Sequence, residues 1–326
     1  MIESVITTDP HLARRHRWGG LFEWICKLAT WGCLVILAVM IIGILINGWP
    51  HLSWSFLTSF DSVNNPKTAG IKAGIWGTFW LILLMACFSI PVGIGAAVYL
   101  EEYARPNRLT RLIQLNILNL AGVPSIVYGI LGITVFGHMF GFFGNAPPRE
   151  AVWALPFGTK VMTGALTLSL LILPVVIIST QEALRTVPAS LRHSSLALGA
   201  TQWQTIRFQV LPAAMPGILT GIILAVSRAV GESAPLIMVG ALSYVHQTPG
   251  NISSVTDFFT KPQGIMAAPF DVFTAMPLVI YNWASQSDPV YQSLAAAGIV
   301  VLLVVLLLMN TAAVVIRQRF QNWIRW

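Results

Sequence analysis

Charged side chains are scarce in this sequence, and their scarcity decides its broad class. Only 10% of the 326 residues are Asp, Glu, Lys or Arg, whereas 56% are hydrophobic, and the mean hydropathy is +0.73. A soluble domain carries about 25% charged residues, so this chain has too few to cover a surface that faces water. Composition therefore predicts an integral membrane protein. The net charge of +7 is then expected to reflect membrane sidedness rather than nucleic-acid binding.

Residue patterns for metal, nucleotide or covalent chemistry are also missing. Cys26, Cys33 and Cys87 lie in or beside apolar segments without metal-ligand spacing, and the six histidines are scattered; both facts argue against a metal site or a disulfide framework. No Gly-Lys dipeptide occurs, so the chain has no P-loop to cradle nucleotide phosphates. No nucleophile, base and orienting group recur at useful spacing. We expect no catalytic residue, and no metal or cofactor bound directly by this chain.

Long apolar segments are what the sequence has instead. Six of them exceed the ~20 residues needed to cross the hydrocarbon core, at 28–48, 73–100, 112–143, 161–181, 213–245 and 294–316. The first is too long for a signal-peptide core and has no small-residue cleavage site, so we expect it to remain as an anchor. The third and fifth are too long for one straight helix and contain Pro124, Pro216 and Pro235. The sequence thus predicts an all-α polytopic membrane protein with six transmembrane helices, two of them broken or tilted.

Cations are unevenly divided between the two sides that these spans define. Thirteen would lie on one side, at Arg14, Arg15, Arg17, Lys27, Arg105, Arg108, Arg111, Arg185, Arg192, Arg207, Arg317, Arg319 and Arg325. Five would lie on the other, at Lys67, Lys72, Arg149, Lys160 and Lys261. By the positive-inside rule this division predicts that both termini are cytoplasmic.

The segment between the fourth and fifth spans has the signals of two short helices. Pro188 suits a first helical turn and Gly199 a C-terminal cap, while Thr201 and Gln204 have capping-box spacing for a second helix that Pro212 would close. Its apolar and basic side chains allow two interpretations, an interfacial helix on lipid headgroups or a docking surface for a protein; they are Leu191, Leu198, Trp203, Arg192 and Arg207.

Within this segment, LALGATQWQTIRFQVLP resembles the cytoplasmic signature loop of ABC-importer permeases. Gly199, Leu211 and Pro212 fall at the family's spacing, whereas residues 193–195 (His-Ser-Ser) replace the usual Glu-Ala-Ala and Gln209 replaces an isoleucine. The resemblance implies a coupling helix that docks on a separate ATPase subunit, which would carry ATP and Mg²⁺. The coupling residues that it implies are Arg185, Leu191, His193, Leu198, Gly199, Ala200 and Pro212.

Three further stretches narrow the resemblance. YLEEYA after the second span, VPSIVYGILG in the third and SRAVGESAPLIMVGA in the fifth resemble the A-type subunit (PstA) of phosphate-specific transport permeases. This family implies the type I, binding-protein-dependent ABC importer permease fold in a bacterial inner membrane. It also implies a homologous C-type permease as heterodimer partner, two ATPase subunits and a periplasmic phosphate-binding protein. Alternatives that remain open are a permease for another oxyanion, such as sulfate or molybdate, and a stand-alone secondary transporter.

The expected organisation follows from the spans and the resemblance. Residues 1–27 form a cytoplasmic N-terminal segment, and residues 28–70 form the first transmembrane helix with its outer loop. Residues 71–316 form the ABC permease transmembrane domain, with the coupling loop at 182–212. Residues 317–326 form a cytoplasmic tail.

Arg228 and Glu232 stand out because they lie within an apolar segment. They are one helical turn apart and can pair, but a charge at the bilayer centre costs about 2.5–3.5 kcal/mol. One interpretation is an ion pair that holds helices together. The other is a substrate pathway lined by Arg228, Glu232 and Ser233, because Pro235 should open the helix at Gly231 and irregular backbone is tolerated in membranes where it lines a cavity.

Other polar residues receive simpler interpretations. Glu101 and Glu102 are expected to be solvated interface residues, with contact to a partner as the alternative. Tyr128 and His138 are expected to be satisfied polar groups of the core rather than ligands. Asp257, Asp271 and Asp288 make the last outer loop acidic, which would help to orient a binding protein.

Overall fold

The computed structural model describes residues 10–62, 65–138, 158–254 and 256–323, and this part of the chain is helical without strands. The α-helices are α2 (Pro10–Gly48), α3 (Trp54–Thr58), α4 (Lys72–Val98), α5 (Arg108–Ala121), α6 (Ser125–Gly132), α7 (Val161–Arg185), α8 (Ala189–Ala197), α9 (Gln202–Thr205), α10 (Leu211–Val230), α11 (Ala234–Val239), α12 (Asp257–Thr260), α13 (Pro262–Ala267), α14 (Met276–Ala284) and α15 (Pro289–Trp323). Three π-helical stretches, η3 (Tyr99–Tyr103), η4 (Ile133–His138) and η6 (Ile206–Val210), adjoin α4, α6 and α10. Short 3₁₀ turns are η1 (Trp49–His51), η2 (Pro66–Thr68), η7 (Pro249–Asn251) and η8 (Ala268–Phe270).

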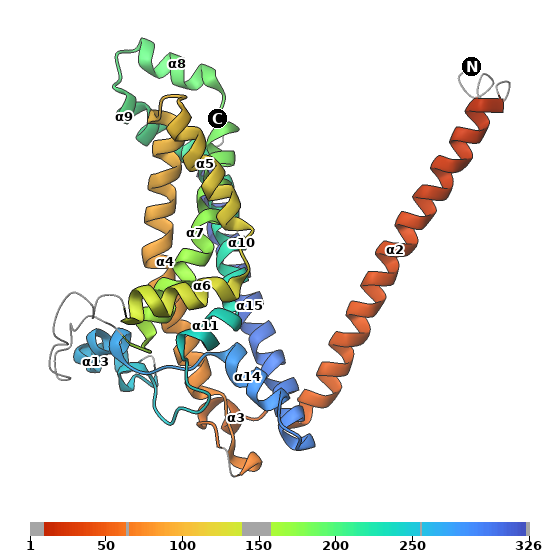
Figure 1. The fold of residues 1–326 in the computed structure, drawn as a ribbon, viewed down its shortest axis with the longest axis vertical. Helices are drawn as coiled ribbons and strands as arrows, with labels where there is room; N and C mark the ends of the chain where they lie inside the picture. The colour runs from red at the N-terminus through yellow and green to blue at the C-terminus, as the bar shows by residue number, and fades with distance from the viewer. Residues whose placement is uncertain (1–9, 63–64, 139–157, 255, 324–326) are drawn as a thin grey trace.

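The bundle is built around α7, which packs against both α4 and α10 (Figure 1). Small residues let these helices approach closely: a Cβ atom added at Gly93 of α4 would lie 2.6 Å from Val176 of α7, and one at Gly217 of α10 would lie 2.8 Å from Ala183. Large apolar side chains such as Met85 and Ile172 fill the remaining space and are fully buried. Close contact through small residues is how helices associate where lipid supplies no hydrophobic drive.

The described chain has five to six candidate membrane spans, against six predicted. In the described chain, five helical segments are long and apolar enough to cross a bilayer, at Trp18–His51, Lys72–Tyr103, Val161–Arg185, Gln202–Val230 and Pro289–Arg319. The pair α5 and α6, which bends by 105° between Ala121 and Ser125, brings the number to six when it is counted as one broken span. Gly122 and Pro124 lie at that bend, so the broken helix that was expected in the third segment is present. The all-α polytopic fold is confirmed.

Two boundaries differ from the prediction. The first helix begins at Pro10, so it extends through much of the segment that was assigned to an N-terminal tail. In the fifth segment, α11 ends at Val239, where the following Gly240 has a φ of 85° that stops the helix, and residues 241–248 are not helical. Hydropathy alone extended that span because the apolar sequence continues past the helix end.

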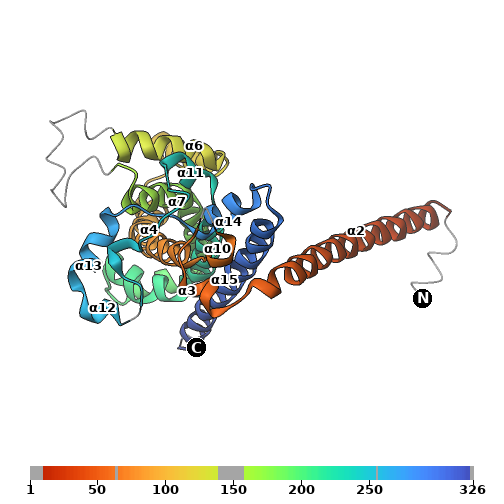
Figure 2. The ribbon, with the colours of Figure 1, turned by 90° about the horizontal axis from the view of Figure 1, so that it is seen from below.

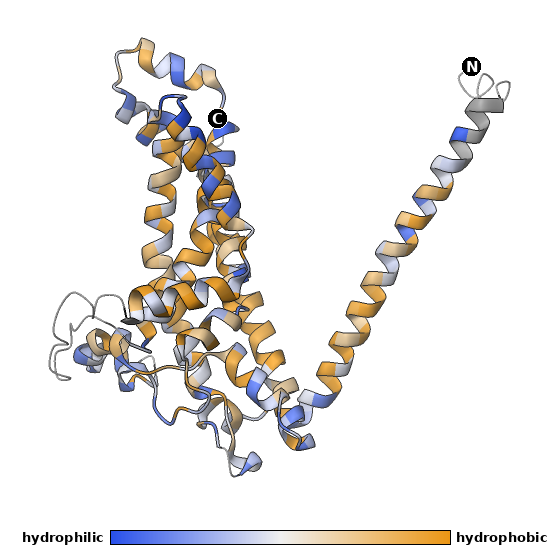
Figure 3. Cartoon of the chain, viewed as in Figure 1, coloured by the Kyte–Doolittle hydropathy of each residue, from blue (hydrophilic) through white to orange (hydrophobic). Residues whose placement is uncertain are grey.

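Helix α2 leaves the bundle at a wide angle, as both ribbon views show (Figures 1 and 2). Its contacts are concentrated on α15 near Gly48, where an added Cβ would lie 2.8 Å from the backbone of Ala296 and Ala297. Its apolar side chains elsewhere are exposed, including Trp31 and Ile36. Figure 3 shows apolar residues along the helix and over the bundle, with hydrophilic residues gathered toward both ends of the molecule.

The two ends of the bundle differ in structure. At one end, called here the loop end, α8 and α9 project beyond α4 and α7 (Figure 1). At the opposite end lie α3 and α12–α14, where polar contacts join α14 to α4 and to the loop that follows α3. There Trp283 donates a hydrogen bond from Nε1 to the buried Asp61 carboxylate (2.9 Å), and Met276 donates its N–H to Thr78 Oγ1 (2.9 Å).

Candidate functional site

The 182–212 segment forms a projecting loop with the local structure that its sequence indicates. Helix α8 starts after Pro188, and Gly199 follows it with a φ of 86°, a conformation that suits glycine. Thr201 and Gln204 form a reciprocal capping box at the start of α9. Each of these three features depends only on residues that are close together along the chain.

The prediction that Pro212 closes the second short helix was wrong. Helical structure continues from Gln202 through η6 and α10 to Val230. Pro212 cannot donate a hydrogen bond to the carbonyl of Phe208 and would crowd it in a regular α-helix. The wider π-helical turn immediately before it, in which the Leu211 N–H bonds to the Ile206 carbonyl, accommodates the proline without ending the helix.

Two ion pairs attach this loop to η3, the π-helical stretch that follows α4. Arg185, the last residue of α7, donates from Nε to Glu101 Oε1 (2.9 Å). Arg192 of α8 donates from Nη2 to Glu102 Oε1 (2.7 Å) and from Nε to both carboxylate oxygens (3.2 Å). Gln202 donates from Nε2 to the Glu102 carbonyl (2.6 Å). The expectation that both glutamates are merely solvated was therefore wrong.

A signal for these pairs was present in the sequence. Two adjacent acids end one apolar segment, and two arginines follow another segment that ends on the same side. Opposite charges at the same membrane face are candidates to pair once their helices are neighbours. The contact between α4 and α7 joins distant parts of the chain, so local sequence patterns do not predict it.

The outer surface of the loop is apolar. Leu198 is 90% exposed, and Leu196, Trp203 and Phe208 are also exposed; the last of these and Leu196 were not anticipated. His193 is exposed as well, and Ala200 is half-buried. Leu191 differs from the prediction because it is half-buried and packs inward with Leu184 and Val210. An exposed apolar patch at the end of a projecting loop can bind a partner surface.

The second feature is a helix interruption around two charges. Helix α10 ends at Val230 and α11 begins at Ala234, with Gly231–Ser233 between them. Gly231 takes the C-cap position, Ser233 is half-buried, and Pro235 is buried in the first turn of α11. These are the residues at which Pro235 was expected to open the helix.

The charges themselves are only loosely paired. Arg228 Nε lies 3.4 Å from Glu232 Oε1, and the two side chains are 52% and 19% exposed. A pair whose purpose was to hold helices together would be expected to be buried and closely bonded. Here the guanidinium lies at a surface and retains donors for another acceptor.

This interruption packs against the other broken helix. Helices α6 and α11 are in contact, and a Cβ added at Gly129 would lie 2.8 Å from the Cα of Pro235. Beside it, the buried Tyr128 donates its hydroxyl to the Leu120 carbonyl (2.7 Å), so it is a satisfied core group as expected. The side chain of His138 lies outside the described residues. The contact between the two broken helices was not predicted, because Gly129 and Pro235 are far apart along the chain.

The acidic residues of the last outer loop have structural partners. Asp257 accepts hydrogen bonds from the N–H groups of Ser253 and Ser254 and pairs with Lys261 (3.2 Å). The N–H of Ser253 and the Lys261 ammonium hold the pKa of the Asp257 carboxyl well below its usual range. Asp271 accepts from the Gly250 N–H (2.6 Å). Within the described chain, no three His, Cys, Asp or Glu residues cluster as a metal site would require.

Comparison with curated proteins gives relatives that are ABC or phosphate permeases. The chain is 35% identical over 224 residues to the probable ABC transporter permease protein YqgI of Bacillus subtilis, covering 67% of this chain and 71% of that protein. It is 33% identical to the phosphate transport system permease protein PstC of Mesorhizobium japonicum, covering 67% and 71%. It is 39% identical to the phosphate transport system permease protein PstA 1 of Mycobacterium tuberculosis (strain H37Rv), covering 52% and 51%.

The fold also matches solved transporters. A chain of the bacterial alginate ABC transporter, solved in complex with an alginate pentasaccharide-bound periplasmic protein, aligns with a TM-score of 0.61 at 17% identity and covers 91% of this chain and 93% of that chain. The family model described as "Binding-protein-dependent transport system inner membrane component" matches residues 89–322, which contain both the projecting loop and the interrupted helix. The chain therefore belongs to the family of binding-protein-dependent transport system inner membrane components, the multi-pass permease subunits of ABC importers.

Proposed function

We propose that this chain is the A-type permease subunit of an ATP-driven importer that moves inorganic phosphate from the periplasm to the cytoplasm. The observation that carries the proposal is the interrupted helix with Arg228 and Glu232 beside it. Relatives that are named phosphate transport permeases support the choice of substrate. Because both PstA and PstC proteins match, the assignment to the A-type rests on the LEEYA and GESAP stretches.

The chemistry of the interruption suits a tetrahedral oxyanion. The Arg228 guanidinium can offer two parallel N–H donors to two phosphate oxygens. Glu232 limits how long the anion stays, because its carboxylate neutralises Arg228 between passages and repels the anion. Glu232 can also accept a hydrogen bond from a protonated phosphate oxygen, which sulfate lacks at neutral pH. Ser233 adds a hydroxyl at the same opening.

The loop end supports a partner that supplies energy. The exposed Leu196, Leu198 and Trp203 offer a docking surface for an ATPase subunit, of which two copies would bind ATP and Mg²⁺. Helical structure is continuous from Gln202 to Val230, about 40 Å at 1.5 Å per residue. A displacement of the docked loop would therefore reach Arg228 along one element. We assign the coupling role to residues 182–212, including Arg185, His193, Gly199, Ala200 and Pro212.

The remaining surfaces fit the other expected partners. The exposed side of α2 and the open face around Arg228 would be covered by a homologous C-type permease. The end of the bundle that carries α3 and α12–α14 would receive a periplasmic phosphate-binding protein. In this proposed arrangement both termini lie in the cytoplasm of a bacterial inner membrane. The first membrane crossing and its outer loop occupy residues 28–70, within and after a helix that begins at Pro10, and the permease domain occupies residues 71–316. Reporter fusions that place residue 326 outside would contradict this arrangement.

The test of the proposal is transport by the reconstituted complex. Phosphate, presented with its binding protein, should stimulate ATP hydrolysis and uptake, whereas sulfate should not. Arg228→Gln should reduce uptake about 10- to 100-fold, since a hydrogen bond to a charged group is worth about 1.5–3 kcal/mol. The complex should still assemble and hydrolyse ATP. Arg228→Lys should restore only part of the uptake because the planar fork is lost, and Glu232→Gln should slow turnover more than assembly.

A control and two rival functions complete the design. Arg319→Gln removes an exposed cation from α15 and should leave uptake unchanged. If Arg228→Gln left uptake near normal, or only prevented the protein from accumulating, the pair would be a structural contact. Stimulation by sulfate or molybdate would identify another oxyanion permease, and transport without any ATPase would identify a secondary transporter.

A further inference from the structure

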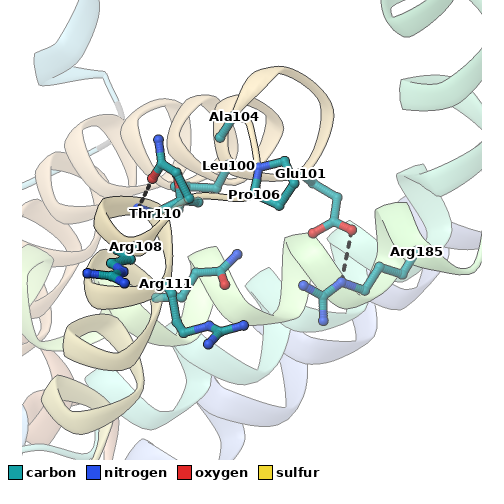
Figure 4. A pocket seen from close by; sticks show the side chains of 10 residues that line it. Leu100, Glu101, Ala104, Pro106, Arg108, Thr110, Arg111 and Arg185 are labelled. Carbon is teal, nitrogen blue, oxygen red and sulfur yellow. Dashed lines mark hydrogen bonds and ion pairs between the residues drawn. The ribbon is translucent and has the colours of Figure 1, made fainter.

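A cavity lies beside the loop end, between the start of α5 and the end of α7 (Figure 4). Its volume is about 490 Å³, within the range of about 300–1,000 Å³ that is usual for ligand sites. It is lined by Leu100, Glu101, Ala104, Pro106, Asn107, Arg108, Thr110, Arg111, Gln114 and Arg185. Arg108 and Arg111 have no predicted role beyond membrane sidedness.

The charge of this cavity is positive. Three arginines line it, and the one acidic residue of the lining, Glu101, is already engaged by Arg185 Nε at 2.9 Å. In Figure 4 the side chain of Arg111 extends from α5 toward the space in front of Arg185, so two guanidinium groups face the cavity from different helices. Asn107, Thr110 and Gln114 add polar groups to the lining. Such a site requires an anionic occupant with several oxygen acceptors.

The position of the cavity favours a phosphate group in particular. The cavity adjoins the end of the second span and the start of α5, which the charge distribution places at the cytoplasmic surface. Basic pockets at this depth are suited to the headgroups of anionic phospholipids. We propose that this cavity binds a phosphate group, carried either by an anionic phospholipid of the cytoplasmic leaflet or by free inorganic phosphate in the cytoplasm.

Occupancy would act on the loop through Arg185. A phosphate group between Arg111 and Arg185 gives the Arg185 guanidinium a second acceptor besides Glu101. Glu101 is followed directly by Glu102, whose carboxylate holds Arg192 of α8 at 2.7 Å. The bound phosphate group therefore competes with Glu101 for Arg185. Glu101 adjoins Glu102, the residue that holds α8 through Arg192. This inference does not depend on which solute the pathway carries.

The experiment measures binding to the purified complex in two backgrounds, the native chain and Arg228→Gln, the second of which removes any contribution from anion in the pathway. One arm titrates phosphatidylglycerol and counts bound lipid by native mass spectrometry, with a galactolipid that lacks phosphate as reference. The other arm titrates inorganic phosphate by calorimetry in delipidated samples. Arg111→Gln should weaken binding about fivefold in at least one arm. One arginine near an anionic surface contributes about 1 kcal/mol to binding, which corresponds to that factor.

Two further variants separate charge from folding. Arg105→Gln makes the same change in the same segment, but Arg105 does not line the cavity, so its affinities should equal those of the background. Arg111→Lys should lose less affinity than Arg111→Gln, because the charge stays and the fork is lost. An effect in the lipid arm identifies the headgroup as the source, and one in the phosphate arm identifies the free anion.

The proposal is overturned if Arg111→Gln and Arg105→Gln bind alike in both arms. Equal binding of the galactolipid and phosphatidylglycerol overturns the headgroup as the source of the phosphate group. It is supported further if phosphatidylglycerol changes ATP hydrolysis by the complex with Arg111 intact and changes it less in Arg111→Gln. Failure of phosphate transport would leave these binding results unaffected, so the two proposals stand or fall separately.

Discussion

Replacing Arg192 with glutamine should release α8 from the bundle. The Arg192 side chain is 23% exposed, and that of Glu102 is 10% exposed. The Arg192 guanidinium donates hydrogen bonds to four acceptor atoms. They are the two oxygens of the Glu102 carboxylate, the Val187 carbonyl (2.8 Å from Nη1) and the Leu184 carbonyl (2.9 Å from Nη2). Removing it leaves a largely buried carboxylate without its cation.

The magnitude follows from this partial burial. Breaking a fully buried pair costs about 3–5 kcal/mol and an exposed pair at most about 1 kcal/mol, so this pair should be worth about 2–3 kcal/mol. Amide hydrogens of Ser194–Leu198 should then exchange about 30- to 150-fold faster, since about 1.4 kcal/mol corresponds to a factor of ten. Phosphate-stimulated ATP hydrolysis by the complex should fall because α8 no longer holds its position.

A double-mutant cycle tests the reasoning. Glu102→Gln alone should have a similar effect, and the double variant should be little worse than either single variant. Arg207→Gln removes an exposed cation of the same loop and should leave exchange in α8 unchanged. Additive effects of the two single variants, or exchange that rises less than about threefold, would show that this ion pair does not hold α8.

Three further predictions concern single residues. Gly199→Val should uncouple ATP hydrolysis from uptake, because a φ of 86° costs a branched residue about 1–2 kcal/mol although an added Cβ would meet no neighbour; Gly199→Asn should be milder, and equal effects would exclude backbone strain. Gly129→Ala should impair uptake because its Cβ would press on Pro235 at 2.8 Å, at a cost of about 1–3 kcal/mol, whereas Gly95→Ala has open space and should not. Burial raises the pKa of the Asp61 carboxyl, so the folded state binds its proton more readily, and thermal stability should decline as the pH rises from about 4 through the raised pKa. Asp61→Asn should remove this decline, while Asp257, whose pKa is lowered, acts with the opposite sign below about pH 4; an unchanged pH profile in Asp61→Asn would refute the assignment.

Features that short stretches of sequence determine were predictable. The number of spans follows from hydropathy and charge, and the caps at Gly199 and Thr201 follow from turn and helix chemistry. The interruption at Gly231–Ser233 follows from Pro235, which removes a hydrogen bond within one turn. Each of these depends on residues that are neighbours along the chain.

Features that depend on distant residues were not predictable in this way. The arginine that pairs with Glu101 or Glu102 is determined by the packing of α4 beside α7. Arg185 and Glu101, for example, are 84 residues apart in the sequence. The contact of Gly129 with Pro235 requires the two broken helices to meet. Leu191 was assigned to the outer surface because the loop was treated without the bundle behind it. Pro212 was misjudged because nothing local indicates that a π-helical turn will absorb it.

The wide separation of α2 from the bundle has a consequence for how the chain is made. Its contacts are concentrated on α15, which leaves the ribosome about 250 residues later, or roughly 12–50 s at ordinary rates of synthesis. During that interval α2 is held in the bilayer by its own apolar side chains alone. The mean hydropathy of 2.7 over its most apolar stretch is therefore a requirement of biogenesis, because this helix must be stable in lipid before any part of its own chain can support it.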